Sequence, residues 1–350
     1  MKKIILPLLY AALCCLALLS LPSCRGDLPP LASTTPVSSQ PTFPSESTAE
    51  PVYDPEHYVV IRTAEDLMAF QRAVNEDGYR FDGMTVVFLD DVDMLDYLWS
   101  PLDGKMLKDV TFDGMGHTVS NLRFTDYEYP LDAEPDNTHK GCGLVDVAEG
   151  DMIFRDLTLL DSTMVAYDHS VGNFVGSIKE GLVIFENCQT VGFTAEGWLN
   201  WFQRDRENGG HAVAMWMGGF VGSIGERGRA TFSRCSAEDL TLEGFHNLAC
   251  FVGYDVSGRL DASDFSDCNV TGADLTFSYC LAESYTAEQD RKFVSVFFNS
   301  HDWTDNIDDC TEAGCHFSDV AFYDWANDCT PYTPDTFRSQ PRREEVDTND

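Results

Sequence analysis

Aromatic and acidic side chains gather in three stretches of this sequence. The stretches are residues 124–141, residues 198–216 and the residues between Cys268 and Phe293. The members that we single out as candidate ligand-binding residues are Tyr127, Tyr129, Trp198, Trp201, Asp205, Trp216 and Tyr285. Ring faces stack on sugars and carboxylates bind hydroxyl groups, so this combination is typical of a glycan-binding cleft. A second interpretation is that the rings only pack these loops onto the body of the protein.

Two carboxylates of the second stretch could also take part in catalysis. Asp205 and Glu207 are the best candidates for a glycosidase, which needs two carboxyl groups about 5.5 Å or roughly 6.5–9.5 Å apart. A polysaccharide lyase acting on uronates commonly uses Arg or Lys as its base, and this chain is poor in both. We therefore expect a binding or structural role rather than an enzyme, with a lyase or glycoside hydrolase on the same face as the alternative.

The overall charge excludes nucleic acid as a partner. The chain has 58 Asp and Glu residues against 23 Lys and Arg residues, and its formal net charge is −35. Such a chain would need a concentrated basic patch to hold a phosphate backbone, and the sequence has none. The same charge would repel an anionic glycan.

Acids and cysteines offer further chemistry. Two acidic clusters could bind Ca²⁺ through oxygen ligands, although a solvated acidic face is the simpler interpretation; they contain Asp90, Asp91, Asp93 and Asp96, and Asp302, Asp305, Asp308 and Asp309. We expect no other cofactor and no metal site. Beyond Cys24 the chain has nine cysteines, an odd number, so at least one is unpaired or pairs with another chain; they are Cys142, Cys188, Cys235, Cys250, Cys268, Cys280, Cys310, Cys315 and Cys329.

Three of these cysteines share one repeat position, and two others are close in sequence. Cys188, Cys235 and Cys268 are expected to be small interior residues in a stack. Cys310 and Cys315 are close enough for a local disulfide. A metal site made by these two with His316 and Cys329 would have a spacing that matches no common zinc pattern.

Two short patterns alternate along residues 143–320 and predict a repeat fold. One is an apolar pair or triplet, in most units with a glycine beside it; its valine is at positions 145, 175, 221, 252 and 294, which are 30, 46, 31 and 42 residues apart. The other is Phe-x-x-Cys or a variant, at 154–157, 185–188, 232–235, 265–268 and 317–320. Each unit holds short strands broken by Gly, Asn, Asp and Ser, so we expect a solenoid whose units stack with interior ladders of Phe and Cys.

The repeat also places the three aromatic stretches. Each one lies after a strand and before the apolar-glycine pattern. Equivalent turns of a stacked solenoid emerge on one side, so the three stretches are expected to converge on one face.

The units resemble a known family. Residues 141–145 (GCGLV), 172–177 (GNFVGS) and 218–223 (GGFVGS) look like the Gly-Leu-Val-Gly (GLUG) repeats of bacterial surface proteins. Residues 109–124 resemble the coil that usually precedes such repeats, and the opening from residue 61 resembles the cap that starts these domains. The resemblance covers roughly residues 59–325. It implies an all-β, single-stranded, right-handed parallel β-helix of the pectate-lyase-like kind, and it says little about activity.

A short helix is expected to cap the start of the solenoid. Thr63 and Asp66 form a variant of the capping box, and Leu67, Phe70 and Val74 fall on one helical face. An amphipathic helix there would cover the apolar cross-section of the first unit and block aggregation at its edge.

The N-terminus indicates export and membrane attachment. Lys2 and Lys3 precede an apolar run, and residues 21–24 (Leu-Pro-Ser-Cys) look like a bacterial lipobox, in which Cys24 receives the lipid. We therefore predict a signal peptide at 1–23, a Pro/Ser/Thr-rich linker at 24–57, a repeat domain at 58–329 and a disordered tail at 330–350. The expected location is extracytoplasmic, on the bacterial cell surface, with a glycan or another cell-surface ligand as partner.

Overall fold

The protein is described by a computed structural model. It describes residues 54–125, 140–166, 169–197, 216–244, 247–255, 263–277, 294–298, 310, 313–324 and 330–332. The chain divides into two compact units, 1–51 and 52–350, and all described residues belong to the second. The predicted signal peptide, Cys24 and most of the linker therefore lie outside the described residues.

Parallel strands make up most of the described chain, and they form three sheets. The first sheet contains β1 (Tyr58–Ile61), β2 (Thr85–Phe88), β4 (Val110–Asp113), β8 (Val145–Glu149), β9 (Met152–Arg155), β13 (Val175–Glu186), β17 (Val221–Ser233), β20 (Val252–Asp255) and β21 (Ser263–Ser266). The second contains β3 (Val92–Asp93), β5 (Thr118–Ser120), β6 (Arg123–Thr125), β10 (Thr158–Leu160), β11 (Thr163–Ala166), β14 (Gln189–Val191), β15 (Thr194–Gly197), β18 (Ser236–Gly244), β22 (Asn269–Phe277), β24 (His316–Asp324) and β25 (Thr330–Tyr332). The third contains β7 (Lys140–Cys142), β12 (His169–Gly172), β16 (Met217–Gly218), β19 (Leu248–Ala249) and β23 (Val294–Ser295).

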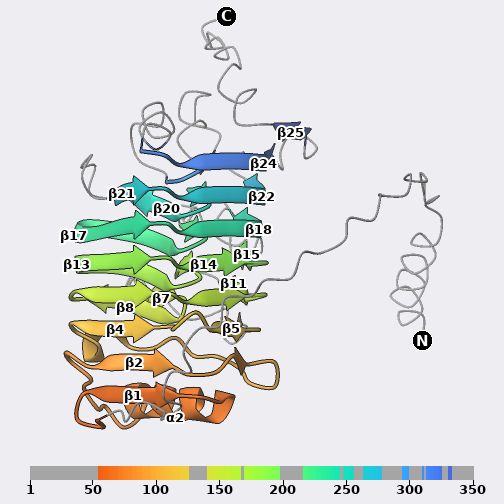
Figure 1. Ribbon diagram of the computed structural model, residues 1–350. Helices are drawn as coiled ribbons and strands as arrows, with labels where there is room; N and C mark the ends of the chain where they lie inside the picture. The colour runs from red at the N-terminus through yellow and green to blue at the C-terminus, as the bar shows by residue number, and fades with distance from the viewer. Residues whose placement is uncertain are drawn as a thin grey trace, which may run out of the picture. The chain divides into compact units, whose positions relative to one another are not determined.

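The chain visits the three sheets in turn, and each visit adds one or two strands beside their equivalents in the unit before. From β12 it passes to β13 in the first sheet, to β14 and β15 in the second, and then to β16 in the third. Figure 1 shows the units stacked in chain order, with β1 at one end and β24 near the other. Only β25 runs antiparallel, against β24, among the described pairings. The prediction of an all-β, parallel repeat architecture is confirmed at this level.

Phenylalanine ladders fill the interior. Neighbouring rings of the first ladder are stacked with centroids 4.8–5.2 Å apart, and this ladder consists of Phe112, Phe154, Phe185, Phe232 and Phe265. A second ladder, of Phe174, Phe220 and Phe251, meets the first edge to face. Each apolar side chain alone would bury little surface, but a ladder buries each inner ring between two others. The expected interior stack is present.

The recurring glycines let the third sheet lie against the first. A Cβ added to Gly176 would come within 2.1 Å of the Cys142 amide nitrogen, and one added to Gly222 within 2.5 Å of the Val171 nitrogen. Both neighbours are backbone atoms of the third sheet, which cannot move aside without breaking their own strand pairing. The glycine of the repeat is therefore required by the close approach of two strands.

Another repeated position turns the chain from the first sheet into the second. The residue two places after the ladder phenylalanine has φ between 50° and 53° in four successive units, at Asp156, Asn187, Arg234 and Asp267. Asn and Asp tolerate this left-handed conformation better than most residues, so three of the four positions suit it. Arg234 is the exception.

The predicted cap is confirmed. Helix α2 (Ala64–Asn75) begins with a complete capping box between Thr63 and Asp66, and its buried residues include Leu67, Phe70 and Val74. Figure 1 shows α2 beside β1, at the first end of the stack. A short 3₁₀ helix, η1 (Gly104–Met106), packs near β8.

Two of the expected equivalences in the last units are wrong. Val294 pairs with Leu248 in the third sheet, and the partner of Val252 is Phe298. Phe317 pairs with Val270 and Val320 with Ala273, so residues 317–320 do not repeat the Phe-x-x-Cys pattern. The length of the connection before β23 hides the spacing between the last two units. The register there follows the stacking of the phenylalanines and not the similarity of short sequence motifs.

Candidate functional site

The long connections of the repeat begin and end at one corner of the stack. This corner, between the second and third sheets, is here called the loop corner. It is bounded on one side by β6, β11, β15, β18 and β22, and on the other by β7, β12, β16, β19 and β23. Because both sets of strands pair in register, the connections between them leave and re-enter at equivalent positions. The three predicted insertions begin and end at this corner, and the third begins after β22, at residue 278, rather than directly after Cys268.

Long and short connections alternate at the loop corner. The connections after β6, β15 and β22 span residues 126–139, 198–216 and 278–293, whereas those after β11 and β18 span only 167–168 and 245–247. Neighbouring strands of a sheet lie about 4.8 Å apart, so successive long connections start about 10 Å from each other. A repeat with a short connection thus separates each pair of long ones.

Most of the predicted site residues fall in these connections. Tyr127, Tyr129, Trp198, Trp201, Asp205, Glu207 and Tyr285 lie outside the described residues. Trp216 is described, and it directly precedes β16 at the loop corner. Its carbonyl oxygen accepts a hydrogen bond from the Val171 amide at 2.7 Å, which fixes it to the third sheet.

Trp216 stacks on Tyr254, a residue that the sequence analysis did not single out. Their ring centroids are 5.4 Å apart and the planes are inclined by 29°. Both side chains are half-buried, so part of each ring is open to a ligand. Tyr254 occupies the position held by Ser177 and Ser223 in the two preceding units. This change from Ser to Tyr within an otherwise regular repeat is the sequence feature that could have pointed to Tyr254.

In the two preceding units buried serines, Ser177 and Ser223, pair in one row with Tyr254 across the first sheet. The Ser223 hydroxyl hydrogen-bonds with Ser170 at 2.9 Å and with Ser177 at 3.0 Å. All three side chains are buried. The row therefore changes from a closed serine cluster to a partly open aromatic pair within one unit.

Two glutamates face each other across neighbouring strands at the same corner. Glu196 in β15 pairs in register with Glu243 in β18, one residue before each strand ends. Partial burial raises the pKa of Glu243, and the neighbouring Glu196 carboxylate raises it further. Two like charges on adjacent strands favour protonation of one of them. The repeated Thr-x-Glu-Gly at 194–197 and 241–244 could have revealed this pair.

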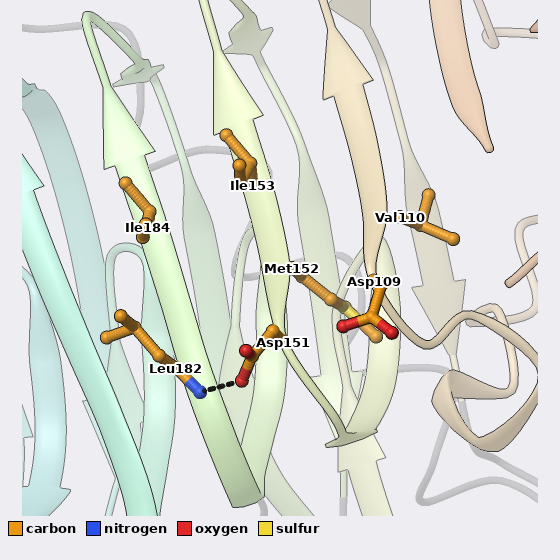
Figure 2. Close-up of a pocket in the computed structure, with 7 residues that line it drawn as sticks. All are labelled: Asp109, Val110, Asp151, Met152, Ile153, Leu182 and Ile184. Carbon is orange, nitrogen blue, oxygen red and sulfur yellow. Dashed lines mark hydrogen bonds between the residues drawn. The ribbon is translucent and has the colours of Figure 1, made fainter. Parts of the chain in front are cut away.

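The first sheet carries a separate shallow cavity of about 250 Å³. Figure 2 shows Ile153 and Ile184 side by side on β9 and β13, with Asp109 and Asp151 near the starts of β4 and β9. Asp151 is already engaged, since its Oδ1 accepts a hydrogen bond from the Leu182 amide at 2.8 Å. The cavity contains no aromatic ring and no residue of the loop corner, so it offers only a small apolar surface beside two acids.

Three of the four acids of the first predicted calcium cluster are engaged by protein groups. Asp91 accepts hydrogen bonds from the Thr118 amide and pairs with His117, while Asp93 accepts from the Leu95 amide and the Asn121 side chain. These hydrogen bonds lower the pKa of both carboxyls. Asp90 pairs with Arg62 at 3.2 Å. The second cluster, residues 302–309, lies outside the described residues.

Within the part of the chain that the structure describes, no three His, Cys, Asp or Glu side chains are arranged to hold a metal ion. No helix in the described ranges is long and apolar enough to cross a membrane. Comparison of the chain with protein-family models, curated proteins and solved structures gives no match.

Proposed function

We propose that this protein is a lipid-anchored bacterial surface protein that binds glycans at the loop corner. In this proposal the repeat domain is a single-stranded right-handed parallel β-helix of the GLUG-repeat kind. The parallel pairing of each unit with the next supports it, as do the glycines between the first and third sheets. Cys24 is the anchor, and the Pro/Ser/Thr-rich linker holds the domain away from the membrane.

One observation carries the binding part of the proposal. The aromatic-rich connections all start at the corner where Trp216 and Tyr254 expose part of a stacked pair of rings. Sugars bind through ring stacking and through hydrogen bonds from hydroxyl groups to carboxylates. The loop corner offers both, because Glu196 and Glu243 lie at the ends of the strands that lead into it. A neutral glycan suits the site better than an anionic one, given the net charge of −35.

A glycan array probed with the soluble part, residues 58–330, tests this proposal. We expect binding to a defined set of neutral glycans, and we expect Trp216→Ala to weaken it about tenfold, the loss of about 1.4 kcal/mol of stacking. The matched control is Tyr79→Ala, which removes a ring that is 62% exposed and lies near the capping helix. Equal binding by Trp216→Ala and the parent would place the site elsewhere.

The anchor has its own test. Cys24→Ala removes the sulfur that would carry the lipid, so the variant should accumulate as a precursor that takes up no labelled fatty acid. Labelling at the parent level would contradict the anchor and leave the glycan proposal untouched.

The glutamate pair favours glycoside hydrolysis as a second candidate function. In-register side chains on adjacent parallel strands lie about 4.8 Å apart, close to the 5–5.5 Å separation of a retaining glycosidase. The raised pKa of Glu243 suits a general acid, and Glu196 would act as the nucleophile. Release of reducing ends from a bound glycan, lost in Glu243→Gln and kept in Glu238→Gln on the same strand, would establish this activity. Binding without any release would leave the protein a binding module.

A further inference from the structure

Four cysteines occupy one position in successive units and form a buried ladder. Backbone hydrogen bonds of 2.9–3.0 Å connect the rungs, from Ser236 to Cys188, from Asn269 to Cys235 and from His316 to Cys268. The fourth rung is therefore Cys315, which the sequence pattern did not assign to the stack. All four side chains are at most 1% exposed.

The last rung has a neighbour that the other rungs lack. Cys310 is 3% exposed and contributes no strand to the sheets, yet its carbonyl oxygen accepts a hydrogen bond from the Cys315 amide at 3.0 Å. The Cys315 sulfur is in hydrogen-bonding contact with two thiols, those of Cys268 and Cys310. Three sulfurs thus meet at the C-terminal end of the ladder, and Cys315 is the middle one.

Strand geometry decides which of the two pairs can form a bond. Cys268 and Cys315 directly precede the paired parallel strands β22 and β24, so their Cβ atoms are held side by side at about the 4.8 Å strand spacing. A disulfide needs a Cβ separation of about 3.5–4.5 Å and side chains that turn toward each other. Cys310 belongs to none of the strands, so its side chain is not held at the strand spacing from Cys315.

The thiols further down the ladder are engaged as donors. Cys235 donates to the Ser233 carbonyl at 3.4 Å, and Cys268 donates to the Ser266 carbonyl at 3.4 Å. Burial raises the pKa of Cys188, whereas hydrogen bonds from Cys268 and Cys310 lower the pKa of Cys315. A hydrogen bond from Cys268 also lowers the pKa of Cys235, so it is the position of Cys310 beside Cys315 that selects the pair.

We propose that Cys310 and Cys315 are joined by a disulfide in the mature protein, and that Cys188, Cys235 and Cys268 remain thiols. The bond fastens Cys310 to the last rung, where the ladder would otherwise end. In the cell the proposal rests on the export that we propose above, because disulfides persist in oxidising compartments.

The chemistry is an ordinary thiol–disulfide exchange. The Cys315 thiolate attacks the disulfide of an exchange catalyst or of a small-molecule disulfide and forms a mixed disulfide, releasing one thiol of that oxidant. The Cys310 thiolate then attacks the Cys315 sulfur, and the second thiol of the oxidant leaves. The two cysteines lose two electrons and two protons, which the oxidant gains as two thiols. Since both sulfurs are buried in the folded chain, the exchange takes place before the last unit closes.

Refolding of the full chain with glutathione and glutathione disulfide tests the pairing without relying on export. Free thiols are blocked with iodoacetamide in denaturant, and the unreduced protein is cut with a glutamyl endopeptidase. Glu312 lies between Cys310 and Cys315, so a disulfide keeps the two resulting peptides joined until reductant is added. We expect this linked pair, together with alkylated Cys188, Cys235 and Cys268.

Variants make the result decisive. Cys268→Ser should leave the linked peptides unchanged, and Cys310→Ser should leave Cys315 alkylated. Reductant should lower the Tm of the parent by about 4 °C and leave that of Cys310→Ser unchanged. A link from Cys315 to Cys268, or alkylation of both Cys310 and Cys315 before reduction, would overturn the proposal. A bond that forms in vitro but is missing from protein extracted from membranes would contradict the proposed export and leave the pairing intact.

Discussion

The phenylalanine ladders and the loop corner are built by the same repeat, but they differ in what changes from unit to unit. In the ladders Phe185, Phe232 and Phe265 keep their type, their stacking and their pairing. The loop corner varies instead: its connections change from short to long, and in the adjoining first sheet Ser223 of one unit is replaced by Tyr254 in the next. Constancy serves burial, since every rung must match its neighbours. The connections at the corner can vary in length because they are not rungs that must match a neighbour in the interior.

The largest expected effect comes from a charge in a ladder. Phe232→Asp would place a carboxylate between the rings of Phe185 and Phe265, and we expect a loss of about 5 kcal/mol in the free energy of unfolding. Denaturant titration measures it. The control Thr231→Asp puts the same charge on the partly exposed face of the same strand and should cost less than about 1 kcal/mol. Equal losses in the two variants would mean that the ladder is not the part that holds the fold.

Acidity should produce the next effect, through Asp146 at the edge of the first sheet. Its Oδ1 accepts hydrogen bonds from the amides of Gly104 and Val147, but burial dominates and raises the pKa of Asp146 from 3.8 to about 6. The folded chain therefore binds a proton more tightly than the unfolded chain does. The resulting stabilisation is full below about pH 4 and is lost as the pH rises through 6, by at most about 3 kcal/mol.

Unfolding measurements between pH 4.5 and pH 7.5 test this direction. Glu149 does not titrate in this window. Its ion pair with Lys179 lowers the pKa of that carboxyl from 4.5, so its stabilising contribution is complete above pH 4.5 and is lost only at lower pH. Asp146→Asn keeps an oxygen acceptor and removes the titration, so its stability should vary less across the window. A parent that grows more stable from pH 4.5 to pH 7.5 would contradict the assignment.

The smallest effect is a gain at the turn between the first two sheets. Arg234 has φ of 53°, where its counterparts are Asp156, Asn187 and Asp267. Arg234→Asn should raise the free energy of unfolding by about 0.5 kcal/mol, because Asn accepts the left-handed conformation more readily. Arg234→Lys keeps both the charge and the steric cost, and it should leave the stability unchanged. A gain from Lys as large as that from Asn would show that the conformation is not the cause.

The sequence determined the features that depend on residues close together in the chain or on strict repetition. The capping box needs only Thr63 and Asp66, three residues apart, and the interior Phe ladder needs only a pattern that recurs. The shared position of the three long connections followed from the same repetition. These predictions were confirmed because a stacked repeat turns equal positions in sequence into neighbours in space.

Only the tertiary structure decided which residues meet where the repeat becomes irregular. Connections of different length hide the register between units. From the sequence alone, Val294 is the expected equivalent of Val252, whereas the residue that pairs with Val252 is Phe298. The same uncertainty concealed Cys315 as the fourth rung, the stack of Trp216 on Tyr254, and the pairing of Glu196 with Glu243. Register between distant segments is set by which rungs bury their rings together, and that choice depends on contacts that no local pattern records.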